Sequence, residues 1–235
     1  MFLLIFIVTA AISIIAVCRV KAAYAKWSKV PAGSGYTGAR CAERILESAG
    51  IHDVEIVEAD SMLGDHYDPM NKRLVLSTEN YHGDSAAALG VSAHECGHAI
   101  QHKLAYAPLQ WRMASVGATT YANQAVTWLP LLFWITGGYH GGFGISLHTY
   151  LLVMSLGWGI IMLFNLITLP VEFDASRRAK IILNKMHFLS SEEAETGMRK
   201  VLDAAAWTYV AAFITSLLYM LYYLLPLLMG GRRND

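Results

Sequence analysis

One stretch of the sequence carries residues that could bind a metal ion and act on water. It reads His94-Glu95-Cys96-Gly97-His98, the pattern H-E-x-x-H. On a helix, His94 and His98 lie one turn apart and point to the same side, so two imidazoles can bind one zinc ion. Glu95 lies beside this pair and can accept a proton from a water that zinc has made more acidic. The stretch therefore predicts metal-assisted hydrolysis.

A catalytic zinc ion needs a third protein ligand and an open position for water. His102 lies ~12 Å from His94 along a straight helix axis, at a rise of ~1.5 Å per residue. Zinc bonds of ~2 Å cannot span that distance. Glu172, in the run Pro170 to Ser176, completes a His, His, Glu set like that of thermolysin-type enzymes. Asp174 is the second choice, and the alternative is that Glu172 only caps a helix.

The composition restricts the class of protein. The 235 residues are 55% hydrophobic and 15% charged, which is too apolar for a typical soluble domain. The formal net charge is zero, so no electrostatic feature favours nucleic acid. Three cysteines at unrelated spacings favour a reducing compartment over a disulfide framework. We expect Cys96 to be a small buried side chain rather than a zinc ligand.

Four segments are long and apolar enough to cross a bilayer. They are residues 1–18, two segments within residues 113–170 (113–138 and 145–169), and residues 204–229. The first segment carries its positive charges after the apolar run, unlike a cleaved signal peptide. The sequence predicts a mainly α, multi-span integral membrane protein with about four transmembrane helices.

Residues 19–112 predict a small α+β region between the first two spans. Thr37 is expected to cap a short helix that Gly50 ends, followed by strands at residues 54–59 and 74–77 with a polar turn at 65–69 between them. A helix that Asp84 or Ser85 would cap is expected from Ser85 through the H-E-x-x-H stretch to about Leu104. The second polar segment, residues 171–203, follows Pro170, which is expected to end the third span.

The distribution of basic residues indicates how the spans are oriented. Residues 19–112 contain ten Lys and Arg and residues 171–203 contain six, whereas the C-terminal tail contains two. With four spans both basic regions face one side, which the positive-inside rule identifies as the cytoplasm. We therefore expect a multi-pass protein of the cell membrane with both termini outside. Glu172, His94 and His98 would then meet on the cytoplasmic side.

Several motifs together resemble those of YugP-type membrane zinc metallopeptidases. The resemblance covers nearly the whole chain and rests on four stretches: Asp65–Pro69, Leu76-Ser77, Ala93–Gln101 and Glu172–Ser176. It implies a zincin-like active-site helix and a distant similarity to HtpX-type proteases. It also implies one zinc ion per chain, with His94, His98 and Glu172 as ligands and Glu95 as the catalytic residue.

The chain departs from the HtpX-like pattern at one position. Four residues after the ligand glutamate that pattern has an aspartate, which orients a ligand histidine, whereas this chain has Ser176. A serine hydroxyl can accept a hydrogen bond from an imidazole, but more weakly than a carboxylate. Asp174 or Arg177 could share this task.

The resemblance leads us to expect peptide or membrane-protein substrates. His66 or Tyr67 could stabilise the oxyanion, but a turn held together by Asp65 and Asp68 explains that stretch equally well. The segment Leu74–Ser77 could bind an extended substrate as an added strand. The expected partners are the substrate and the lipid bilayer, without nucleic acid, and homo-oligomers are left open.

Two other classes of function fit the sequence less well. A non-catalytic zinc-containing scaffold or chaperone-like module would need the metal but not a general base, so Glu95 argues against it. A transporter would need ionisable residues within the spans or repeat symmetry, and the sequence has few of the former and no sign of the latter. We therefore favour a zinc metalloendopeptidase.

Overall fold

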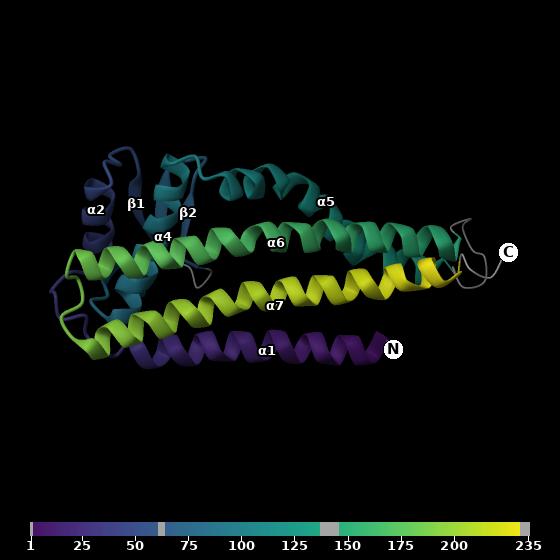
Figure 1. The fold of residues 1–235 in the computed structure, drawn as a ribbon, viewed down its shortest axis with the longest axis horizontal. Helices are drawn as coiled ribbons and strands as arrows, with labels where there is room; N and C mark the ends of the chain where they lie inside the picture. The colour runs from purple at the N-terminus through teal and green to yellow at the C-terminus, as the bar shows by residue number, and fades with distance from the viewer. Residues whose placement is uncertain (1, 61–63, 137–145, 231–235) are drawn as a thin grey trace. The chain divides into compact units, whose positions relative to one another are not determined.

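The computed structural model describes residues 2–60, 64–136 and 146–230 (Figure 1). The chain is mainly helical, with one small sheet. Its elements, in order, are α1 (Phe2–Trp27), α2 (Gly38–Ser48), β1 (Glu55–Ala59), β2 (His66–Asp68), β3 (Arg73–Ser77), α3 (Thr78–His82), α4 (Ala86–Lys103), α5 (Ala107–Ile135), α6 (Leu147–Lys185) and α7 (Glu192–Gly230). Contacts group these residues into two compact units, one mainly apolar and one that contains the sheet.

The apolar unit comprises residues 1–14, 111–168 and 209–235. Aromatic side chains form its core, where the rings of Phe133 and Tyr150 stack with centroids 4.2 Å apart. Among the described residues, three helices are long and apolar enough to cross a membrane, namely α1, α6 and α7. Helix α5 covers the described part of the predicted span 113–138, but it is not among these three helices.

The polar unit comprises residues 15–110 and 169–208 and contains the sheet. The strand order is β1-β3-β2, with β1 parallel and β2 antiparallel to β3. Helix α4 packs against α2 and against strands β2 and β3 (Figure 1). The structure confirms two predicted helix caps, because Thr37 accepts a hydrogen bond from Arg40 N and Ser85 accepts one from Ala88 N.

Two predictions about the sheet are wrong. The expected polar turn at residues 65–69 contains strand β2, whose Tyr67 pairs with Leu74 of β3. Sequence patterns miss so short an edge strand because three residues show no clear alternation. The segment Leu74–Ser77 belongs to β3, the central strand, which pairs with β1 along residues 73–77 and with β2 along residues 73–75. It is therefore not an edge strand to which a substrate could add along its length.

The sequence suggested that the third span ends at Pro170, and this prediction is wrong. Helix α6 continues from Leu147 to Lys185 with Pro170 inside it. Proline cannot donate the backbone hydrogen bond to the carbonyl one turn earlier, but the neighbouring residues Thr168, Val171 and Glu172 are buried and hold the helix in place despite that loss. Glu172 therefore lies within a helix, and the alternative that it caps a helix N-terminus is wrong.

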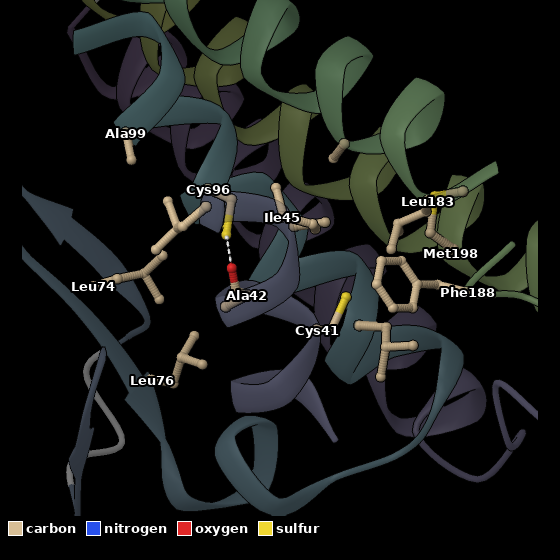
Figure 2. Packing of buried hydrophobic residues seen from close by; sticks show 14 of the residues in the cluster. Cys41, Ala42, Ile45, Leu74, Leu76, Cys96, Ala99, Leu183, Phe188 and Met198 are labelled. Atoms are coloured by element: carbon tan, nitrogen blue, oxygen red, sulfur yellow. Dashed lines mark hydrogen bonds between the residues drawn. The ribbon is translucent and has the colours of Figure 1, made fainter. Parts of the chain in front are cut away.

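A buried apolar cluster fixes α4 against its neighbours in the polar unit (Figure 2). Cys96 of α4 is fully buried and its thiol points to the carbonyl oxygen of Ala42 on α2, 3.7 Å away. Leu74 and Leu76 of β3 and Leu183 of α6 belong to the same cluster. Burial raises the pKa of the Cys96 thiol, which disfavours the thiolate that a metal would need. Cys96 is thus the buried filler expected from the sequence.

Gly97 allows α4 and α6 to approach closely. A Cβ atom at this position would lie 2.9 Å from the carbonyl oxygen and 3.1 Å from the Cα atom of Ala175 on α6. These are backbone atoms, so they cannot move aside as a flexible side chain can. The small residues Gly97 and Ala175 therefore set the distance between the two helices.

Replacing Gly97 with alanine should lower the thermal stability of the protein. Glycine to alanine in a helix normally gains about 1 kcal/mol, but forcing a methyl group into a closed contact costs about 1–3 kcal/mol. The matched control is Gly117→Ala on α5, where a Cβ would meet nothing within 4 Å. Melting in detergent should show a lower midpoint for Gly97→Ala and an equal or higher one for Gly117→Ala. Equal stabilisation by both changes would contradict the close approach.

Candidate metal centre

Helix α4 presents His94 and His98 on one face. The two rings have centroids 4.8 Å apart and an interplanar angle of 86°. Their side chains are 13% and 12% exposed, so both are largely buried but still reach the surface of the site. This is the arrangement that the spacing of four residues predicts for a helix.

Glu172 of α6 lies opposite this histidine pair. Its Oε2 atom is 3.2 Å from Nε2 of His94 and 3.5 Å from Nε2 of His98. The side chain is 2% exposed, and the ligand atoms of the three residues all lie within 4.8 Å of one another. Residues 78 positions apart in the sequence are thus brought together by the contact between α4 and α6.

The three side chains fit a zinc ion. Zinc binds histidine nitrogen and carboxylate oxygen at ~2.0–2.1 Å, so two ligands at a tetrahedral angle lie ~3.3 Å apart. The two Nε2 to Oε2 distances of 3.2 and 3.5 Å agree with that separation. Two nitrogens and one oxygen also leave a fourth position open, as catalytic zinc sites do.

The outer nitrogen of each histidine has its own hydrogen-bond partner. Nδ1 of His94 lies 3.1 Å from Oγ of Ser176, and Nδ1 of His98 lies 3.0 Å from Oε1 of Gln101. These contacts leave each Nε2 directed towards Glu172. Such partners fix the orientation of histidine rings around metals.

Charge in the centre is strongly affected by burial. Burial raises the pKa of the Glu95 carboxyl, although the two histidines partly oppose this. Burial alone would lower the pKa of His98, but the hydrogen bond with Glu172 and the charges of Glu95 and Glu172 outweigh it and raise the pKa. A metal ion binding to His98 would therefore have to displace a proton.

Strand β2 contacts the centre through Glu95. The backbone N–H of Tyr67 donates to Oε2 of Glu95 at 3.0 Å. The phenol of Tyr67 lies 2.9 Å from Nδ1 of His102, so His102 contacts β2 and is not in the group of three. The exposed His66 has its Nδ1 3.0 Å from the carbonyl oxygen of Gly64.

The remaining predicted residues lie near the centre or brace the strand. Asp174 accepts hydrogen bonds from Gln101 at 3.0 Å and from Arg177 and Arg178, and it is not in the group of three. Arg177 itself is 67% exposed. Asp65 accepts from Ser77 and Asn80 and so ties the start of β2 to the end of β3 and to α3. Asp68 accepts from Met70 and Asn71 in the turn between β2 and β3, so both aspartates hold this stretch together.

Comparisons with known proteins agree with this chemistry. The family described as "Putative neutral zinc metallopeptidase" matches residues 2–228. The chain belongs to this family. It is also 42% identical over 221 residues to "Putative membrane protease YugP" of Bacillus subtilis (strain 168), covering 92% of each chain. No solved structure gives a significant match.

Membership of this zinc metallopeptidase family supports zinc as the metal, and the group of His94, His98 and Glu172 is where it could bind. Sequence reasoning missed Gln101 and Gly97 as parts of the centre. Gln101 lies three residues after His98, the spacing at which side chains meet on a helix, so its position was a usable signal. The role of Gly97 depends on α6 and had no local signal.

Proposed function

We propose that this protein is a membrane-embedded zinc metalloendopeptidase that hydrolyses peptide bonds of membrane or membrane-associated proteins and peptides. His94, His98 and Glu172 would hold one zinc ion. The observation that carries the proposal is the convergence of their ligand atoms within 4.8 Å, next to the buried carboxylate of Glu95.

Each residue of the proposed centre has its own role in peptide hydrolysis. When bound, zinc would polarise the scissile carbonyl and make a water molecule more acidic. Glu95 would take the proton of the attacking water and pass it to the leaving amine, and burial raises the pKa of its carboxyl, which makes it a stronger base. The Tyr67 N–H contacts Oε2 of Glu95, and we assign the proton transfer to the other carboxylate oxygen.

The edge of β2 that pairs with no strand among the described residues is the proposed binding place for an extended substrate. Tyr67 directs its backbone N–H away from β3 and towards Glu95, so this edge faces the catalytic carboxylate. A peptide that pairs with an edge strand is held mainly through its backbone. Such binding would give weak preference for substrate side chains.

The ligand set supports four membrane spans. If His94, His98 and Glu172 share one zinc ion, the chain must cross the membrane an even number of times between residues 98 and 172. Helix α6 supplies one crossing by its hydropathy, and we infer that α5 supplies the other. Its 29 residues span ~43 Å at ~1.5 Å per residue, enough for a bilayer core of ~30 Å. Exposed Asn123 and Gln124 lower its hydropathy.

The charge distribution supports a site that faces the cytoplasm. With α5 as a span, the ten basic residues of 19–112 and the six of 171–203 lie on one side. The positive-inside rule makes that side the cytoplasm and puts both termini outside.

Replacing Glu95 with glutamine should abolish cleavage without removing zinc. The amide cannot accept the proton, and general acid–base catalysis contributes at least ~10²-fold to such reactions. Cleavage of a casein-like protein and bound zinc are measured on the purified protein, with Glu193→Gln as the exposed control. Full cleavage by Glu95→Gln with zinc retained would refute the mechanism. Normal zinc without cleavage in the wild type would favour a scaffold.

The four-span topology predicts where reporters become active. Fusions after Gly35 and after Ser191 should report the cytoplasm, whereas a fusion after Ile135 should report the outside. A fluorescent protein and a periplasmic phosphatase at the same positions give opposite signals and serve as mutual controls. A cytoplasmic signal after Ile135 would mean that α5 does not cross the membrane. The chain would then not cross the membrane an even number of times between residues 98 and 172, which contradicts the proposed topology.

A further inference from the structure

Gln101 is a fully buried polar side chain that the mechanism above does not use. It lies on α4, three residues after His98. Its Oε1 atom is 3.0 Å from Nδ1 of His98. Its Nε2 atom donates to the carbonyl oxygen of Val171 at 2.8 Å and to Oδ2 of Asp174 at 3.0 Å.

These contacts allow the Gln101 amide only one orientation. Both partners of Nε2 are oxygen acceptors, so the amide nitrogen must face them. The reversed amide would set an oxygen against the oxygens of Val171 and Asp174. Oε1 therefore faces His98, whose Nδ1 must carry a proton. Nε2 of His98 lies 3.5 Å from Oε2 of Glu172, so it is the nitrogen that loses its proton when a metal ion binds.

The same amide joins the two helices that supply the ligands. Val171 and Asp174 lie on either side of Glu172 in α6, whereas Gln101 and His98 belong to α4. Asp174 is also held by Arg177 and Arg178. The chain of contacts thus runs from an ion-paired carboxylate through an amide to the histidine ring.

We propose that Gln101 is a positioning residue for the metal, which fixes the tautomer and ring orientation of His98 and transmits the charge of Asp174 to it. This inference rests on the proposed function only in assigning zinc to His94, His98 and Glu172. His94 differs, since its partner Ser176 has a hydroxyl that can donate or accept and so does not select one tautomer.

Zinc affinity tests this role independently of proteolysis. Gln101→Met keeps the length of the side chain but removes both hydrogen-bonding atoms. Competition with a fluorescent zinc chelator should show ~10–100-fold weaker binding, the usual effect of losing such a partner. The visible spectrum of the cobalt-substituted protein should change as well, because the geometry around the metal is less constrained.

The matched control is Asn80→Leu. Asn80 is a buried amide that accepts from Tyr24 and donates to Asp65, without contact to a proposed ligand. The Asn80→Leu change should lower the melting midpoint of the zinc-free protein but leave zinc affinity and the cobalt spectrum unchanged. If Gln101→Met behaves like Asn80→Leu, Gln101 has only a structural role and the proposal is wrong.

A second variant keeps the test decisive if Gln101→Met does not fold. Asp174→Asn retains an oxygen acceptor for Gln101 but removes the charge, so zinc affinity should fall by a smaller factor than for Gln101→Met. Unchanged affinity would overturn the transmission of charge. If the wild type binds one zinc but cleaves no peptide, the proposed function fails and this proposal stands. If Glu95→Gln stops cleavage while Gln101→Met binds zinc normally, the proposed function stands and the positioning role of Gln101 fails.

Discussion

The close contact of α4 with α6 at Gly97 and Ala175 is the constraint on which the candidate centre depends. With glycine at this point, Glu172 reaches within 3.2 and 3.5 Å of the two histidine nitrogens. Ligand distances in zinc sites vary little, so a small increase in helix separation would move Glu172, the proposed third ligand, out of reach. The H-E-x-x-H stretch supplies two proposed ligands and the proposed base, but the packing of backbone against backbone brings Glu172 to them.

Buried charge explains why the surrounding residues are polar. Two carboxylates, Glu95 and Glu172, lie in a site with almost no exposure, and an unpaired buried carboxylate is costly. The N–H of Tyr67 donates a hydrogen bond to Glu95, and Nε2 of each histidine lies close to Oε2 of Glu172. Gln101 and Ser176 in turn hold the histidines. Each of these six side chains thus has a partner that can be named.

Much of this could be predicted from the sequence, because the signals are local. The caps at Thr37 and Ser85, the helix through His94 and His98, and the apolar stretches now seen as α1, α6 and α7 all follow from short patterns. Strand β2 was missed because three residues carry no periodicity, and α6 continues through Pro170 because tertiary packing outweighs the lost hydrogen bond. The partnership of Gln101 with Val171 and Asp174 needs α6 in place, which no local pattern describes.

X-ray absorption at the zinc edge tests the central claim most directly. On the purified wild type, the account predicts about four nitrogen or oxygen neighbours at ~2.0–2.1 Å with two imidazoles among them, and no sulfur at ~2.3 Å. In Glu172→Gln, either zinc is lost or the carboxylate contribution disappears, while the imidazoles remain. A sulfur neighbour in the wild type, or the same spectrum and zinc content in Glu172→Gln, would contradict the assignment of His94, His98 and Glu172 as the metal ligands.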